Sequence, residues 1–334
     1  MFCQNRVRCF QRRFKGADCF YRLLRYLPTS VSDFFCTMLI DAQNLNPMDF
    51  PAFFFDLLFF IFGAVIGSFL NVLIHRLPRE ESIVFPNSAC PSCQMPIKPY
   101  DNIPILSWLI LRGRCRNCRL SISFRYPLVE LLTALLFVFC FRHAGLSLLL
   151  PLELTFVAAI VALIFIDSEH MILPDAINYP GIFIAFAARI GLPLITGAAV
   201  FDDLQYAPLS NLQIPLAVSS VLGALLGAAA GGGFLWLLGW LWKRLRGVDA
   251  MGLGDVKMML WVGAFLGWRL TLLTLFLAAL TGALSGILFI YSRRERDLQT
   301  QIPFGIFLGI GSIVALFFGN ALINWYISNF IPAN

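Results

Sequence analysis

Residues 53–73 read FFFDLLFFIFGAVIGSFLNVL and contain one charged side chain, Asp56. A helix needs roughly 20 mostly apolar residues to cross the hydrocarbon core of a bilayer. Phe, which is abundant in this stretch, and its glycines Gly63 and Gly67 suit a lipid-facing helix that packs closely through small residues. The stretch therefore predicts a transmembrane helix.

The composition extends this prediction to the whole chain of 334 residues. Hydrophobic residues make up 59% and charged residues 13%, and the mean hydropathy is +0.77. A soluble domain carries about 45–50% apolar and about 25% charged residues, so this balance excludes a soluble enzyme and a disordered chain. The net charge of +6 does not indicate nucleic-acid binding, because residues 1–47, with seven Lys and Arg and three Asp, account for +4 of it.

Seven more apolar windows predict an all-α polytopic membrane protein with about eight transmembrane helices. In chain order the eight windows are Phe53–Leu73, Leu128–Ala144, Leu150–Ile166, Ile177–Ile195, Leu216–Trp242, Val256–Trp268, Leu270–Tyr291 and Phe304–Tyr326. The sixth window is short and follows Gly252, Gly254 and Asp255. We therefore expect its helix to begin inside the protein rather than in lipid.

The Lys and Arg between the windows predict the orientation of the chain. They are concentrated after the first, fifth and seventh windows, and these connections fall on one side of an eight-span chain. The positive-inside rule makes that side cytoplasmic. Residues 1–47 conflict with this topology, because they are basic yet would lie on the opposite side. They are either a basic targeting or interaction extension or, as we favour, the result of a mis-assigned start, with Met48 as the true first residue.

Two CxxC pairs, Cys90-Pro-Ser-Cys93 and Cys115-Arg-Asn-Cys118, lie in the first cytoplasmic connection, residues 75–126. Each pair places two thiolates on one tight turn, and the two pairs complete the S₄ set that zinc prefers. Two disulfides are the alternative, which a reducing cytoplasm disfavours. We therefore predict a cytoplasmic loop with a structural zinc held by Cys90, Cys93, Cys115 and Cys118.

Asp167 and Asp255 lie at the ends of apolar windows, where an ionisable group is costly and therefore a functional candidate. Two neighbouring carboxylates share one proton, so one activates water as a general base while the other protonates the scissile carbonyl, as in aspartic proteases. The alternatives are structural. Asp255 could be a cap at a helix start or an acidic partner of the helix dipole, and Asp167 could be a solvated residue beyond a helix end.

Other charged residues near the windows are weaker candidates. We expect Asp56 to be interfacial and Glu130 to pair with a cation on the cysteine loop. Lys257 either extends to the membrane surface or acts on Asp255. The remaining acidic candidates are Glu169, Asp175 and Asp249, the last in a solvated loop.

The ordered motifs of the chain resemble those of bacterial prepilin peptidases. They run in order from about residue 53 to 310, and motifs this long are specific. They comprise Gly67–Val72 (GSFLNV), Tyr100–Pro104 (YDNIP) between the CxxC pairs, Arg125–Leu131 (RYPLVEL), Ile166–Asp175 with its terminal LPD, Met251–Lys257 (MGLGDVK) and Ile302–Gly305 (IPFG).

The resemblance implies a polytopic inner-membrane aspartic peptidase of the GxGD type, with its active site facing the cytoplasm. Such enzymes cleave the basic leader from type IV prepilins or type II secretion pseudopilins after a Gly, and position by position the catalytic pair is Asp167 and Asp255. Many members also methylate the new N-terminus with S-adenosylmethionine, an activity associated with the cysteine loop. Since all four cysteines are present, we expect the bifunctional form, with no residue assigned to the methyl donor.

The implied organisation is a basic extension (1–47), a first transmembrane helix (48–74), a cytoplasmic tetra-Cys zinc loop associated with methyl transfer (75–126) and a membrane aspartic peptidase domain (127–334). The expected partners are prepilins or pseudopilins and membrane lipids, without nucleic acid, and the oligomeric state stays open. Two alternatives also stay open. One is a peptidase without methyltransferase activity, and the other is a proton-coupled membrane transporter, which accounts for the carboxylates but not for the zinc loop.

Overall fold

The computed structural model of the chain describes residues 52–90, 92–197, 215–248, 251–293 and 303–330. Within these residues the chain forms helices and turns, with two isolated β-bridges and no strand. The all-α prediction is therefore confirmed. The predicted N-terminal extension and Asp249 lie outside the described residues.

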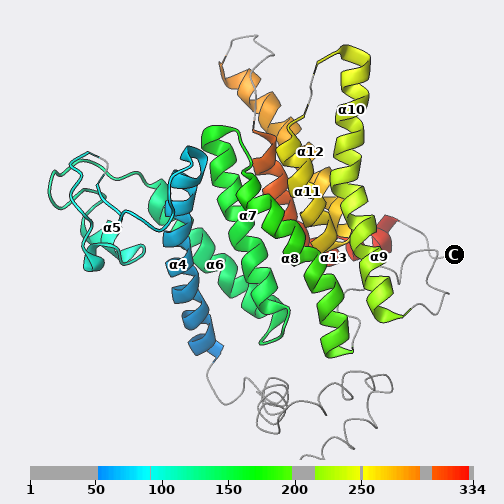
Figure 1. The fold of residues 1–334 in the computed structure, drawn as a ribbon, viewed down its shortest axis with the longest axis horizontal. Helices are drawn as coiled ribbons and strands as arrows, with labels where there is room; N and C mark the ends of the chain where they lie inside the picture. The colour runs from blue at the N-terminus through cyan, green and yellow to red at the C-terminus, as the bar shows by residue number, and fades with distance from the viewer. Residues whose placement is uncertain (1–51, 91, 198–214, 249–250, 294–302, 331–334) are drawn as a thin grey trace, which may run out of the picture.

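Long helices packed side by side form the body of the molecule (Figure 1). They are α4 (Ala52–Arg76), α6 (Arg125–Ala144), α7 (Leu150–His170), α8 (Asp175–Thr196), α9 (Leu216–Ala228), α10 (Phe234–Arg246), α11 (Leu253–Leu266), α12 (Trp268–Arg293) and α13 (Phe304–Phe330). A π-helical turn, η3 (Ala229–Gly233), joins α9 to α10. The connection after α4 contains the short helices η1 (Leu77–Arg79), η2 (Pro99–Asp101) and α5 (Leu106–Ile110), and it projects to one side of α4 and α6.

Seven of the described helical segments are long and apolar enough to cross a membrane, with α9, η3 and α10 forming one segment, Leu216–Arg246. α11 has 14 residues, or about 21 Å at 1.5 Å per residue, which is too short for a hydrocarbon core of about 30 Å. Its residues from Trp261 to Leu266 are all buried. The eight windows thus correspond to seven segments long enough to span a membrane and one shorter helix that lies inside the protein, as expected for the sixth window. The starts of α11 and α13, at Gly254 and Gly305, both lie against Leu173, so α11 and α12 still return the chain to the same end of the bundle.

α11 is held against α9 and η3 by direct contact between backbones. A Cβ added to Gly227 would lie 2.0 Å from the carbonyl oxygen of Gly263, and one added to Gly231 would lie 2.4 Å from that of Met259. Only glycine permits so close an approach. Small residues therefore set the position of the helix that carries Asp255.

The far end of α11 is held by Arg189, an arginine in the middle of α8 that is 1% exposed. Its Nε donates to the carbonyl oxygen of Ala264 at 2.8 Å, and its Nη2 donates to that of Phe265 at 2.9 Å. The last carbonyls of a helix have no partner within the helix, and a positive charge there is favourable. Arg189 therefore satisfies a helix end that is buried inside the bundle.

Candidate active site and metal centre

Asp167 lies in the last turn of α7 and is 5% exposed. Its Oδ2 accepts a hydrogen bond of 3.2 Å from the backbone N–H of Ile306, in the first turn of α13. A Cβ added to the neighbouring Gly305 would lie 2.8 Å from the same oxygen. The alternative of a solvated residue beyond a helix end is therefore wrong, because the carboxylate is buried against the N-terminus of another helix.

Asp255 lies in the first turn of α11, half-buried. The N-cap residue of this helix is Gly252, so Asp255 is not the cap, whereas its place in the first turn leaves the helix-dipole alternative open. Within the described part of the chain, no group donates a hydrogen bond to its carboxylate or forms an ion pair with it. The carboxylate is thus available to a substrate or a water molecule.

The fold brings together the segments that carry the two aspartates. Leu173, in the turn after α7, packs between the backbone at Gly254, next to Asp255, and the backbone at Gly305, next to the Asp167 carboxylate. A Cβ added to Gly254, next to Asp255, would lie 2.8 Å from Leu173 Cβ, and one added to Gly305, next to the Asp167 carboxylate, would lie 3.2 Å from Leu173 Cδ1. Three segments far apart in the sequence therefore meet at one site.

Asn178 and Trp261 support this site, although the sequence reasoning did not single them out. The indole Nε1 of Trp261 donates to Asn178 Oδ1 at 3.1 Å, and Asn178 Nδ2 donates to the carbonyl oxygen of Leu173 at 3.2 Å. Asn178 is fully buried. A polar amide inside an apolar window was the signal that could have marked it.

Lys257, two residues after Asp255, binds Asp175 rather than Asp255. Its Nζ lies 2.7 Å and 2.8 Å from the two carboxylate oxygens of Asp175, and 4.9 Å from the centre of the Tyr179 ring. Asp175 is therefore outside the aspartate pair. This ion pair instead connects the first turn of α8 to the first turns of α11.

The other acidic candidates also have partners elsewhere. Glu169 forms an ion pair with Arg125 at the start of α6. Asp56, near the start of α4, forms an ion pair of 2.6 Å with Arg142 near the end of α6. That pair lies at the opposite end of the bundle from the two catalytic candidates.

The four predicted zinc ligands form one cluster. The Sγ atoms of Cys90, Cys93, Cys115 and Cys118 lie within 4.8 Å of one another, and those of Cys90 and Cys118 are 3.8 Å apart. Four sulfurs at about 2.3 Å from a tetrahedral zinc would be about 3.8 Å apart. The cluster therefore fits a zinc ion.

The two CxxC turns have the same backbone geometry. Cys90 N–H donates to Met95 O and Cys115 N–H to Leu120 O, at 3.0 Å and 2.9 Å. The residues that follow the second cysteines, Gln94 and Arg119, both have positive φ, 55° and 61°. The turns thus present two matching pairs of sulfurs to a shared centre.

The state of the thiols also favours a metal. All four are free, which does not support the alternative of two disulfides. Hydrogen bonds from the Met95 backbone N–H and the Asn117 side chain lower the pKa of the Cys93 thiol to about 6, and the thiolate is the form that binds metals. Despite a hydrogen bond from the Leu120 backbone, burial and hydrogen bonds with the neighbouring thiols raise the pKa of the Cys118 thiol to about 11, so a metal would have to displace its proton. Cys140 lies apart from this cluster, fully buried in α6, as a small hydrophobic residue would be.

The cysteine loop, residues 75–126, is joined to the bundle by Glu130, but not through a cation as predicted. Glu130 Oε2 accepts a hydrogen bond of 2.7 Å from the backbone N–H of Ile105, and no Lys or Arg of the described residues forms an ion pair with it. Nearby, Asn71 Nδ2 donates to the carbonyl oxygen of Tyr126 at 3.0 Å. The cation prediction was wrong because a buried carboxylate is satisfied as well by a backbone donor.

Comparison with protein families gives two matches along the chain. The bacterial peptidase A24 N-terminal domain matches residues 61–144, and the type IV leader peptidase family matches residues 154–287. The first match covers most of α4, the cysteine loop and α6. The second runs from α7 into α12 and contains both aspartates.

The chain is also similar to curated proteins named prepilin leader peptidase/N-methyltransferase. The one from Aeromonas salmonicida (strain A449) is 39% identical over 309 residues, which cover 84% of this chain and 96% of the relative. The one from Pseudomonas aeruginosa is 34% identical over 291 residues, covering 80% and 91%. The one from Myxococcus xanthus (strain DK1622) is 39% identical over 247 residues, covering 74% and 67%. No solved structure matches the chain.

Proposed function

The chain belongs to the type IV leader peptidase family, and from this we propose that it removes the leader from prepilins or pseudopilins, with Asp167 and Asp255 as its catalytic pair, and methylates the new N-terminus. The observation that carries the peptidase proposal is that Gly254, next to Asp255, and Gly305, next to the Asp167 carboxylate, both lie against Leu173. The two aspartates come from α7 and α11, and within the described residues neither is neutralised by an ion pair.

The proposed chemistry is that of an aspartic peptidase. Two neighbouring carboxyl groups share one proton, because they do not both ionise easily. The ionised carboxylate takes a proton from water, whose oxygen attacks the carbonyl carbon of the scissile bond, while the protonated carboxyl group donates to the carbonyl oxygen. The tetrahedral intermediate then collapses, the C–N bond breaks, and the leaving amine takes a proton from the pair. The hydrogen bond from Ile306 orients Asp167 for this role.

We place this chemistry at the cytoplasmic face of the inner membrane, with cleavage after a Gly. The support is the concentration of Lys and Arg in the connections at this end of the bundle. A basic leader would be drawn to the anionic lipids of that leaflet. The apolar helix of the substrate would lie in the bilayer, with its polar end at the two aspartates.

Zinc fits the cysteine cluster as a structural ion. Cys90, Cys93, Cys115 and Cys118 would hold it, and four thiolates close all positions of a tetrahedral zinc. A closed site has no position for a substrate or a water molecule. The ion would therefore stabilise the loop rather than take part in cleavage.

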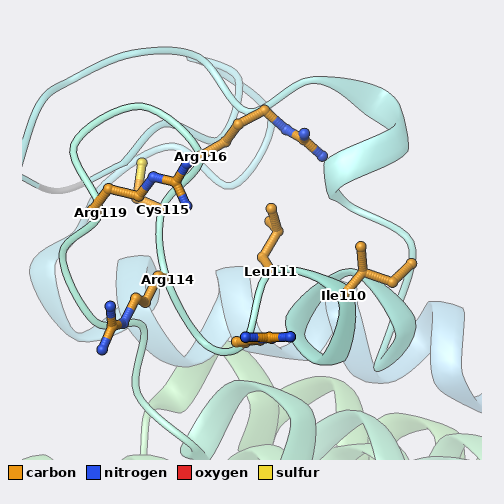
Figure 2. Close-up of a pocket in the computed structure, with 7 residues that line it drawn as sticks. Ile110, Leu111, Arg114, Cys115, Arg116 and Arg119 are labelled. Carbon is orange, nitrogen blue, oxygen red and sulfur yellow. The ribbon is translucent and has the colours of Figure 1, made fainter.

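S-adenosylmethionine, which would supply an activated methyl group, is the donor expected from the family. The cavity in the cysteine loop, about 410 Å³, is lined by Arg112, Arg114, Arg116 and Arg119 (Figure 2). Guanidinium groups repel the sulfonium cation that carries the methyl group. This cavity does not fit the donor, and we assign the donor no binding residues.

The proton-coupled transporter is a weaker alternative. It accounts for carboxylates inside the bundle but not for the cysteine cluster or the family match. A peptidase without methyltransferase activity differs from the proposal only in the second step, so one experiment separates the three.

The experiment uses the full-length protein in nanodiscs and a synthetic peptide with a basic leader, a Gly-Phe junction and an apolar helix. Mass spectrometry is expected to show a cut between Gly and Phe and, with S-adenosylmethionine, the added mass of one methyl group on the new N-terminus. A cut without methyl gain would leave a peptidase alone. No cut, or a cut elsewhere, would overturn the proposed function.

A further inference from the structure

The cavity of about 410 Å³ in the cysteine loop has a lining that the proposed function does not use. Arginines near the second CxxC turn line it together with Ile110 and Leu111, at the end of α5 (Figure 2). The four arginines that line it are Arg112, Arg114, Arg116 and Arg119. The lining therefore combines cationic side chains that could bind an anion with apolar side chains beside them.

Most of the positive charge in this cavity has no carboxylate partner, although the net negative charge of a zinc held by four thiolates would offset part of it, because Cys115 also lines the cavity. Arg116 is paired with Asp101, with two hydrogen bonds from Nε and one of 2.6 Å from Nη2. Among the described residues, no carboxylate lies within ion-pair distance of Arg112, Arg114 or Arg119. A guanidinium group can donate two parallel, charge-assisted hydrogen bonds to two oxygens of one phosphate. Three arginines without a carboxylate partner line one cavity, which favours a phosphate as its ligand.

Next to the cavity, the loop exposes an apolar surface. Leu106, Leu109 and Ile110 of α5 are 56%, 57% and 73% exposed, and Phe124 is 62% exposed. Phe124 directly precedes α6, one of the candidate membrane spans, so this surface lies beside the membrane. Apolar side chains flanked by basic residues are typical of segments that lie in a membrane interface.

We propose that this cavity binds the phosphate of an anionic phospholipid headgroup, with the exposed side chains of α5 inserted among the acyl chains. A soluble anion would account for the arginines but not for the apolar surface, and a zwitterionic lipid would add no net charge to balance them. The lipid would hold the cysteine loop against the membrane face. The proposal is independent of the peptidase chemistry, because it requires only that the chain lies in a bilayer.

Hydrogen exchange of residues 106–122 tests this, with full-length protein in nanodiscs of phosphatidylcholine, with or without phosphatidylglycerol. Exchange is expected to be several-fold slower with phosphatidylglycerol. The triple variant Arg112→Gln, Arg114→Gln, Arg119→Gln is expected to lose that difference while keeping its zinc. A matched variant, Lys243→Gln, Arg244→Gln, Arg246→Gln, removes the same charge from the end of α10 and is expected to keep the difference.

Two further arms keep the result decisive. If the triple variant loses zinc, the variant Leu109→Gln, Ile110→Gln provides the test instead, because it leaves the cysteine turns intact. It is expected to reduce the difference in exchange rate between the two lipid compositions. Inorganic phosphate or an acidic peptide, added to phosphatidylcholine nanodiscs, is expected to have little effect. The proposal would be overturned if inorganic phosphate or the acidic peptide slowed exchange as much as phosphatidylglycerol does. It would also be overturned if the wild type exchanged equally fast in both lipids, or if the triple arginine variant and Leu109→Gln, Ile110→Gln both kept the slower exchange with phosphatidylglycerol.

Discussion

At the scale of single residues, Asp167 and Asp255 differ in how the protein holds them. Asp167 is buried and receives a hydrogen bond from the first turn of α13. Asp255 is half-buried, and the described residues give its carboxylate no donor. The Asp167 carboxylate is thus fixed in place, and the Asp255 carboxylate is open to the reacting groups. This difference suits the proposed catalytic pair, which must be correctly positioned and must exchange a proton.

Replacing Asp167 or Asp255 with Asn is expected to lower the rate of leader cleavage by about 10²–10⁴-fold, because the amide keeps the shape but cannot exchange the proton. Peptide cleavage followed by mass spectrometry measures the rate. Asp56→Asn, at the other end of the bundle, is the matched control and is expected to cleave normally. Near-normal cleavage by either variant of the pair would remove that residue from the mechanism.

Gly305→Ala tests the contact that positions Asp167. Its Cβ would lie 2.8 Å from Asp167 Oδ2, so the carboxylate has to move, and displacements of this kind cost roughly 10²-fold in rate. Gly282→Ala in α12 is the control, because its Cβ would meet Phe307 at 3.5 Å, an ordinary contact. Equal cleavage rates for the two variants would show that the Asp167 position is not critical.

At the scale of elements, α11 is a short helix whose two ends are held by other helices. Arg189 satisfies its C-terminal carbonyls, and Lys257 connects its beginning to α8. Glycines bring its middle against α9 and η3. A helix too short to span the bilayer therefore gains its stability from its neighbours rather than from lipid.

Arg189→Met is expected to destabilise the protein by about 1–3 kcal/mol, because two buried carbonyls lose a charged donor. Thermal unfolding in nanodiscs, followed by circular dichroism, measures the change. Arg142→Met removes an arginine whose side chain is 67% exposed, and exposed ion pairs contribute about 0–1 kcal/mol. A smaller loss for Arg189→Met than for this control would contradict the role assigned to Arg189.

The cysteine loop is expected to bind one zinc per chain. Cys90→Ser or Cys115→Ser should abolish this binding and loosen residues 75–126, with methylation reduced at least as much as cleavage. Metal analysis and limited proteolysis are the measurements. Cys140→Ala, buried in α6, is expected to keep the zinc. Protein without metal and with two disulfides among the four cysteines would refute the zinc assignment.

At the scale of the whole molecule, the aspartate pair and the basic connections are expected to face the cytoplasm. Trypsin added to inverted inner-membrane vesicles is expected to cut within residues 75–126, where Arg is abundant. Trypsin added to intact spheroplasts should leave that loop uncut. The opposite pattern would reverse the topology and, with it, the leaflet from which the substrate is cleaved.

The sequence by itself determined the class of the protein, because membrane spans depend on the apolar content of one continuous segment. It also determined the four cysteines of the candidate metal site, since each CxxC pair brings its two sulfurs together through a local turn. The candidate aspartates were likewise visible, as charges at the edges of apolar windows. Each of these features depends on neighbours in the chain.

Only the tertiary structure decided how distant segments meet. The partner of Asp167 is the Ile306 backbone in α13, that of Glu130 is the Ile105 backbone rather than a cation, and that of Lys257 is Asp175. Such contacts depend on the rotation and depth at which helices pack, and packing is set by many side chains and glycines at once. A backbone N–H, moreover, is identical in every residue but proline, so its use as a partner leaves no mark in the sequence.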